Sequence, residues 1–456
     1  MQKVFSLAKA YSQVFISSSK YDSREIYRSR RRVLMEKLDS VCVFSGMPLE
    51  PGCEEAFVQT WTKFVQEPAF LFLTGVNQAG CYLLLDPGTK SEILFVPKKD
   101  PFKEFWVGKR IGYLENDSEV SELTGFKDVR PVEEFFDVVR SFILRKDAKK
   151  FVYAYFFEKF QGDHNWKFKE KLTKFLRPQD VKVKSAADMH WALRLPLDAP
   201  RIDEAKRAQA ATDKAFRALL EAMPTFKNER ELGLFLDHEL LRNGDGDLAF
   251  PTIVASGANA CCLHYVKKDE PLNKGELVLL DFGTRVGTLH SDISRTIPVG
   301  GKFNPLQKML YEIVLDSATE YRKFVRPGVS LKEIGQIPWE YIMAELETRL
   351  VKGAKGTYKL LYDKRPHGMS HFIGEQIHEG DPGSRSLSTI LEPGMLISCE
   401  PGLYGEFSAV IGGKRYHEMI GIRIEDDLLI TENGHLNLSR RIPKTIGEIE
   451  ALMSKK

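Results

Sequence analysis

Hydrophobic positions up to residue 180 follow two different spacings, one typical of strands and one typical of helices. Short apolar runs predict strands at 40–44, 70–75, 81–85 and 92–96. Apolar residues three and four positions apart predict helices at 24–38, 131–145 and 165–175. Strands mixed with helices in this way predict an α/β domain. This part of the sequence contains no phosphate-binding loop and no nucleophile elbow, so we expect it to serve assembly and substrate access.

The hydrophobic pattern loosens near 182–192, before a long predicted helix at 202–223. We therefore place a domain boundary there. We expect a poorly ordered N-terminal extension at 1–22, an α/β domain at 23–188 and a second domain at 189–456.

Helix starts and stops are well marked in the second domain. Side chains that cap helices stand ahead of three apolar-periodic segments, and a glycine or a basic residue ends two of them. The signals are Asn228 with Glu231 and a stop at Gly244, Asn304-Pro305 with a helix through Lys323, and Ser330 with Glu333.

The segment 277–299, LVLLDFGTRVGTLHSDISRTIPV, predicts a β-hairpin that carries two acidic residues. If Val286-Gly287 forms the turn, Asp281 lies directly opposite Asp292. Cβ atoms of directly paired residues are roughly 4.5–5.5 Å apart. Two carboxylates that close need a cation, a shared proton or an arginine, and a divalent metal is the simplest of these.

A partial repeat of this pattern occurs later in the chain. LNKGELVLLDFG at 272–283 is similar to LEPGMLISCEPG at 391–402, and the capped segments at 228–233 and 330–335 also match. The repeat adds Glu400 as a strand-end carboxylate, and Glu425 ends the predicted strand at 421–425. Two similar halves, each giving two carboxylates, would meet at one site. Four carboxylates could hold two divalent ions roughly 3.5–4 Å apart.

A nitrogen ligand would complete such a site, and His371 is our candidate. It lies in HGMSHFIGEQIH at 367–378, where Gly368 and Ser370 disfavour a helix. We therefore expect an extended or looped segment in which His371 alone binds metal. Arg423, two positions before Glu425 on one strand face, could donate a hydrogen bond to a ligand carboxylate.

Composition narrows the class of protein. The 456 residues are 43% hydrophobic and 28% charged, with a net charge of +3, which argues against nucleic acid as the main partner. No run of eighteen apolar residues is present, so we expect no membrane span. Six cysteines without metal spacing fit a reducing, cytoplasmic compartment, with Cys261-Cys262 as small core residues. The acid-poor N-terminus, with Lys3 and Lys9, leaves organellar targeting as the alternative.

Several motifs together carry a family resemblance. They are Asp281 and Asp292 eleven positions apart, HGMSHFIG at 367–374, EPGLYG at 400–405 and GIRIEDD at 421–427. They resemble the dinuclear metallopeptidases of pita-bread fold, which include aminopeptidase P, prolidase and methionine aminopeptidase. RSRRRVLMEKL at 28–38, LFLTGV at 71–76 and EFWVGKRIG at 104–112 are similar to the N-terminal domain of aminopeptidase P, which methionine aminopeptidases lack.

The resemblance implies an α/β N-terminal domain of the creatinase and aminopeptidase P type and an α+β pita-bread catalytic domain with an internal pseudo-duplication. It also implies two divalent metals, Mn²⁺ in preference to Co²⁺ or Zn²⁺ because the ligands are oxygen-rich. Asp281 would chelate one metal, Asp292 and Glu425 would bridge, and His371 and Glu400 would bind the other. A hydroxide between the metals would be the nucleophile.

Further site residues come from the same resemblance. Glu400 would shuttle a proton, and Arg423 would support a ligand carboxylate. His264 and His378 would contact the substrate and the developing oxyanion, with His367 beside them. Tyr404 would lie near the site. The sequence has His378-Glu379-Gly380 where many bacterial members have His-Asp-Val-Gly, which affects the substrate side.

The implied activity is release of the N-terminal residue from peptides with proline second, by an enzyme that forms a homo-oligomer (a dimer or a tetramer). Prolidase, which needs an Xaa-Pro dipeptide with a free carboxylate, is the near alternative. A non-peptidase homologue is the more distant one, because such proteins lack one or more of the five metal ligands that this sequence has.

Overall fold

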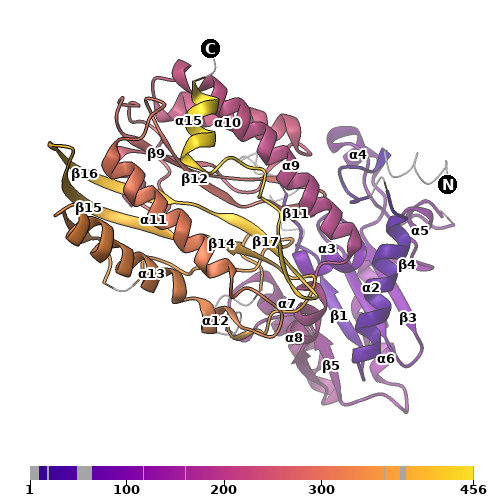
Figure 1. Cartoon of the computed structure of the whole chain (residues 1–456). Coiled ribbons are helices and arrows are strands. Elements are labelled where there is room, and N and C mark those ends of the chain that lie inside the picture. The colour runs from indigo at the N-terminus through magenta and orange to yellow at the C-terminus, as the bar shows by residue number, and fades with distance from the viewer. Residues whose placement is uncertain are drawn as a thin grey trace. The chain divides into compact units, whose positions relative to one another are not determined.

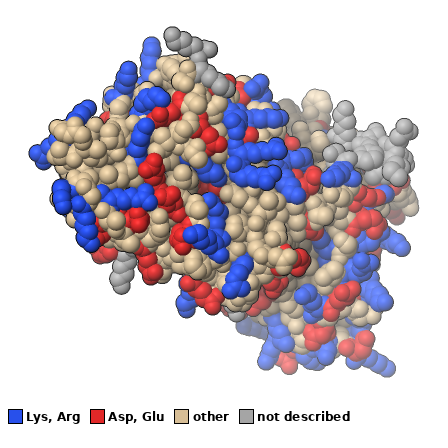
Figure 2. Space-filling view, viewed as in Figure 1, with Lys and Arg blue, Asp and Glu red and all other residues tan. Residues whose placement is uncertain are grey.

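The structure is a computed structural model that describes residues 10–17, 20–48, 64–116, 118–159, 161–363, 365–380 and 387–454. The chain divides into two compact units, Met1–Arg194 and Leu195–Lys456. The boundary at 188/189 stays a prediction. In the described part of the chain, no helix has the length and apolar character needed to cross a membrane. Figure 2 shows acidic and basic side chains interspersed on the visible face.

A six-stranded mixed sheet forms the centre of the first unit (Figure 1). Alternate strand residues point to two apolar clusters, so that Phe44 and Leu83 lie in one cluster while Val43 and Leu84 lie in the other. In spatial order the strands are β4 (Asp128–Pro131), β3 (Ser91–Val96), β2 (Tyr82–Asp86), β1 (Cys42–Ser45), β5 (Phe151–Ala154) and β6 (Lys182–Ser185). The helices are α2 (Ser23–Lys37), α3 (Pro68–Thr74), α4 (Pro101–Val107), α5 (Glu119–Thr124), α6 (Phe135–Ile143), α7 (His164–Leu176) and α8 (Ala187–Arg194).

Two expectations for this unit were wrong. The run at 70–75, predicted as a strand, lies in the helix α3, which Pro68 begins and Gly75 ends in a left-handed conformation. The expected disorder of 1–22 does not hold for the described residues 10–17, where Tyr11 and Phe15 are buried in the core. The alternative of organellar targeting, drawn from the composition of residues 1–20, stays a prediction, and residues 1–9, 18 and 19 of that range lie outside the described residues.

The described residues of the second unit form four three-stranded antiparallel sheets and helices of very different length. Helix α11 lies across strands β15 and β16 (Figure 1). The helices are α9 (Ala199–Ala222), α10 (Glu229–Asn243), α11 (Pro305–Arg322), α12 (Leu331–Ile334), α13 (Ile337–Glu345) and α15 (Ile446–Met453). One sheet contains β8 (Ile253–Ser256), β9 (Leu277–Phe282) and β12 (Ile293–Pro298). A second contains β7 (Asp247–Leu248), β10 (Thr284–Val286) and β11 (Leu289–His290). A third sheet contains β13 (Thr357–Leu360), β15 (Gly402–Ile411) and β16 (Lys414–Arg423). The fourth contains β14 (Leu396–Cys399), β17 (Asp426–Thr431) and β18 (Gly434–Asn437).

The predicted caps of this unit are confirmed. Asn228 accepts a hydrogen bond from the Glu231 amide, and α10 ends at Gly244. Full capping boxes form at Asn304 and Ser330. These caps set where each helix begins.

The hairpin between β9 and β12 forms, but its predicted register was wrong. The turn residues are Gly287 and Thr288, not Val286 and Gly287, because Val286 pairs with Leu289. Gly287 has φ +62°, and a turn with a positive φ at its first central residue favours glycine there. Asp281 therefore pairs with Ser294. Asp292 lies two positions from Ser294 on the same strand face, so the two aspartates are diagonal rather than direct neighbours.

Candidate metal centre

Four carboxylates reach the site from strand ends of the second unit. Asp281 is the last residue but one of β9, and Asp292 immediately precedes β12. Glu400 follows β14 directly. Glu425 lies between β16 and β17. The strand predicted at 421–425 is therefore the end of β16, up to Arg423, followed by a short link. The two sequence halves thus contribute equally.

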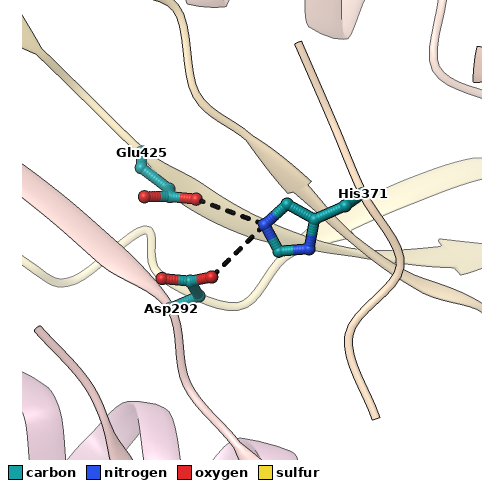
Figure 3. A group of neighbouring side chains, drawn as sticks. All are labelled: Asp292, His371 and Glu425. Atoms are coloured by element: carbon teal, nitrogen blue, oxygen red, sulfur yellow. Dashed lines mark ion pairs between the residues drawn. The ribbon is translucent and has the colours of Figure 1, made fainter. Parts of the chain in front are cut away.

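His371 lies among these carboxylates. Its Nε2 atom is 3.3 Å from Oδ2 of Asp292, 3.6 Å from Oε1 of Glu400 and 4.0 Å from Oε1 of Glu425. Figure 3 shows the imidazole ring pointing between Asp292 and Glu425. One ligand atom from each of Asp292, His371 and Glu425 lies within 4.8 Å of the others. This spacing suits a shared cation.

Backbone contacts hold the His371 segment in an extended form, as predicted. The His371 amide donates to Oγ of Ser398, and the Ser398 amide donates to the His371 carbonyl. Nδ1 of His371 lies 3.2 Å from the carbonyl oxygen of Phe372. A proton on Nδ1 would make that hydrogen bond and leave the lone pair of Nε2 facing the carboxylates.

Arg423 connects the remaining acid, Asp281, to the site. Its Nη2 donates to Oδ2 of Asp281 at 2.6 Å, and its Nη1 donates to the Tyr404 hydroxyl at 3.1 Å. Its Nε donates to Oγ of Ser294 at 2.7 Å, and Ser294 in turn donates to Oε2 of Glu425 at 2.8 Å. One guanidinium therefore orients two of the carboxylates, one directly and one through a hydroxyl.

The electrostatics of the cluster favour a bound cation. Burial raises the pKa of Asp292 well above its usual value, and the charge of Asp281 adds to this. Burial and the neighbouring Asp292 charge likewise raise the pKa of Glu425, and burial and Glu425 raise that of Glu400. Oδ1 of Asp281 is buried and accepts no hydrogen bond from the described residues. These acids with one imidazole form a donor set that fits divalent cations.

The three further histidines surround this cluster to different degrees. His367 has Nε2 3.2 Å from the Tyr404 hydroxyl and Nδ1 3.4 Å from Oε2 of Glu400. Burial lowers the pKa of His367 to about 4, with smaller effects in the same direction from Arg423 and His264. The ring centroid of His378 lies 4.3 Å from that of His371. His264 is exposed and near enough to influence His367 electrostatically.

Two residues with a structural part in the site were missed at the sequence level. Ser294 links Arg423 to Glu425, and its position two residues after Asp292 on one strand could have indicated it. Trp339 packs edge-on against His367 at 5.4 Å, a long-range contact with no local signal. The expectation that Cys261-Cys262 are core residues was wrong for Cys262, which is exposed and lies in the segment that carries His264, two positions before it.

Comparison with known families gives two matches. The family described as Metallopeptidase family M24 matches residues 203–432. The domain described as Aminopeptidase P, N-terminal domain matches residues 27–153. The first match includes all five candidate metal ligands.

Individual relatives cover most of the chain. Xaa-Pro aminopeptidase 3 of Rattus norvegicus is 31% identical over 400 residues, which are 86% of this chain and 77% of the relative. Xaa-Pro aminopeptidase of Escherichia coli is 29% identical over 450 residues, which are 94% of this chain and 98% of the relative. The solved structure of aminopeptidase P from E. coli with the inhibitor Pro-Leu superposes with a TM-score of 0.77, at 28% identity over 94% of this chain and 98% of that one.

Proposed function

The chain belongs to metallopeptidase family M24, and on that premise we propose that it is an Xaa-Pro aminopeptidase that removes the first residue from peptides with proline second. The observation that carries this proposal is the site itself, where Asp292, His371 and Glu425 offer converging ligand atoms. The N-terminal domain match and the relatives named Xaa-Pro aminopeptidase, which align over most of the chain, support this activity over that of prolidase.

We propose that two divalent cations bind here, held by Asp281, Asp292, His371, Glu400 and Glu425. Asp292 and Glu425, the most buried of the five, would lie between the cations. The oxygen-rich donor set favours Mn²⁺. When bound, the cations polarise the peptide carbonyl and make a water molecule acidic enough to act as nucleophile.

The side chains around the cations have distinct proposed tasks. Glu400, whose Oε2 lies 3.4 Å from Nδ1 of His367, would accept the proton that the nucleophile loses and deliver it to the proline nitrogen as the bond breaks. Arg423 holds Asp281 in its orientation. His264, His367 and His378 would lie on the substrate side, where imidazoles can hydrogen-bond the peptide and the oxygen on which negative charge develops.

The substrate class follows from the chemistry of the Xaa-Pro bond. Its tertiary amide has no N–H, so a site that cleaves it has to recognise the free amino group, the carbonyl and the ring. Carboxylates are natural partners for the amino group, and histidines are natural partners for the carbonyl. The site has both.

The test is hydrolysis of a matched peptide series, Xaa-Pro, Xaa-Pro-Xaa and Xaa-Ala-Xaa, with Mn²⁺ present and after its removal by chelation. We expect metal-dependent release of the first residue from Xaa-Pro-Xaa and little cleavage of Xaa-Ala-Xaa. Cleavage confined to Xaa-Pro dipeptides would replace this proposal with prolidase. A metal-loaded protein that cleaves no member would support the non-peptidase alternative.

We further propose a homo-oligomer in the cytoplasm. The helix α4 exposes Phe102, Phe105 and Trp106, whose exposed fractions are 71%, 80% and 54%. An apolar patch of this kind is typical of an interface. The described cysteines are all free, which suits a reducing compartment. Sedimentation of the full chain, with a Trp106→Ser variant beside it, tests the assembly.

A further inference from the structure

Glu229, the first residue of α10, is a fully buried carboxylate with an unusual number of donors. Its exposed fraction is 0%. Oε1 accepts from the Ser256 amide at 2.7 Å, from Oγ of Ser256 at 2.9 Å and from Nδ2 of Asn259 at 3.1 Å. Oε2 accepts from the Tyr265 hydroxyl at 2.9 Å and from the Glu270 amide at 3.2 Å. Charge-assisted hydrogen bonds are about twice as strong as neutral ones, so these contacts stabilise the buried charge.

All of these donors come from one segment, which we call the 256–270 loop. Ser256 ends β8 and starts the loop, whereas Glu270 finishes it. The Glu229 amide also donates to the Glu270 carbonyl at 3.0 Å, and its carboxylate holds both ends and the middle of the loop. The hydrogen bonds of this one residue therefore hold the fifteen residues of the loop, from 256 to 270, against the start of α10.

The loop has no metal ligand, but it carries His264 next to Tyr265. Its other side packs on β16, where a Cβ atom at Gly421 would lie 2.2 Å from the Ala260 carbonyl oxygen. Gly421 is two residues before Arg423, so the loop is pressed between Glu229 and the strand that leads into the metal centre. The backbone of the loop is thus fixed on both sides. Ala260 and Tyr265 of the loop share an apolar cluster with Tyr404, whose hydroxyl lies 3.2 Å from Nε2 of His367, so the loop that carries His264 packs directly on the site.

We propose that Glu229 is a positioning residue for the reaction, acting through the 256–270 loop to hold His264 where it meets the substrate. This inference rests on the proposed function for its consequence in catalysis. The hydrogen bonds of the Glu229 carboxylate reach none of the candidate metal ligands, so its role is separable from metal binding. Misplacement of a substrate-contacting group by about 1 Å can cost on the order of 100-fold in rate.

The experiment is a double-mutant cycle of Glu229→Gln with His264→Ala, measured on the metal-loaded full chain. Glutamine keeps the shape but places an N–H group against donors of the loop. We expect Glu229→Gln to lower kcat/KM by about 10- to 100-fold in the natural background. In the His264→Ala background it should change kcat/KM by no more than about twofold, since its route of action is gone. Equal losses in both backgrounds, or no effect of His264→Ala itself, would overturn the proposal.

Glu231→Gln is the matched control, because Glu231 lies in the same first turn of α10 and is exposed. It bonds the Lys227 amide and Asn228 but no residue of the loop. Tyr265→Phe is a milder variant that removes one donor, and it should move kcat/KM in the same direction by a smaller factor. If Glu229→Gln folds poorly, Tyr265→Phe takes its place in the test.

A second readout does not depend on turnover. Amide hydrogen exchange of the 256–270 loop should rise by about tenfold or more in Glu229→Gln, with exchange of β9 and β12 and the bound metal content unchanged. Unchanged exchange in the loop would overturn the proposal even for an active enzyme. If the natural protein cleaves no Xaa-Pro peptide while the loop loosens as expected, the proposed function fails and the anchoring by Glu229 stands.

Discussion

The guanidinium of Arg423 and the carboxylate of Asp281 are joined by a 2.6 Å hydrogen bond that links the end of β16 to the end of β9. The two strands belong to different sheets, so this contact fixes the orientation of Asp281 in one sheet relative to Arg423 in the other. Both side chains are largely removed from water, with exposed fractions of 5% and 13%. An ion pair in such surroundings depends strongly on geometry.

Replacement of Arg423 by lysine should weaken metal binding. Lysine keeps the charge, but its single ammonium cannot reach Asp281, Ser294 and Tyr404 together as the planar guanidinium does. We expect the Kd for divalent metal to rise by roughly 10- to 100-fold. Titration calorimetry on metal-free protein measures it. Arg349→Lys, in a surface ion pair with Asp316, is the control, and an equal effect there would contradict the assignment.

Asp292→Asn should remove metal while relieving charge repulsion. The amide cannot bind a cation as a carboxylate does, so we expect fewer than two metal equivalents and loss of peptide cleavage. In the metal-free protein the same change should leave stability unchanged or higher, because Asp281 and Glu425 then face one charge less. Elemental analysis and urea unfolding test the two parts. A marked loss of metal-free stability would argue against crowding of charge.

His290 should make stability depend on pH. Burial lowers its pKa to about 4, and Nδ1 lies 2.9 Å from the Gly374 carbonyl. In the unfolded chain the pKa is about 6.5, so the unfolded state binds more protons between these values. Stability is therefore lost as pH falls from about 6.5 toward 4, by roughly 2–3 kcal/mol at most.

The measurement is urea unfolding of metal-free protein across this pH range. His290→Gln should flatten the pH dependence by a corresponding amount, whereas His417→Gln, at an exposed position of β16, should not. Parallel curves for His290→Gln and the natural protein would rule out this origin of the pH dependence.

Gly287→Ala should destabilise the hairpin that aligns Asp281 and Asp292. Gly287 has φ +62°, and a Cβ atom there would meet the Glu204 carboxylate at 2.4–2.7 Å. We expect a loss of about 1–3 kcal/mol. Thermal unfolding measures it, with Gly434→Ala as the control because a Cβ atom there meets nothing within 4 Å. Equal Tm values for the two variants would contradict the observed turn.

Local signals in the sequence predicted much of the second unit. Caps at Asn228, Asn304 and Ser330 depend on side chains within three positions, and all three form. The strand-end acids were found from the repeated pattern, because a strand end is a local feature. The pairing of Asp281 was predicted incorrectly because the position of glycine within a two-residue turn decides the register, and two adjacent choices fit the sequence equally.

Features that depend on distant contacts could not be predicted. Trp339 meets His367 from a helix 28 positions earlier, a contact set by packing. The five hydrogen bonds that the Glu229 carboxylate accepts could not be predicted either, because their donors come from a loop that folds back on α10. The helix α3 is a different case. Residues 70–73 are apolar throughout, which fits a strand as well as a buried helix, and the signals that favour the helix are local ones: the Glu67 cap, Pro68 and the left-handed Gly75.

The close approach of Gly421 to the Ala260 carbonyl has a consequence for engineering. Attempts to widen substrate choice would vary the residues around His264. Whether the loop keeps its place on β16 during such changes depends on Gly421, which has no side chain. Variant libraries should therefore keep Gly421 and change only loop residues. A larger residue at position 421 would push the loop away from β16, whatever the loop sequence.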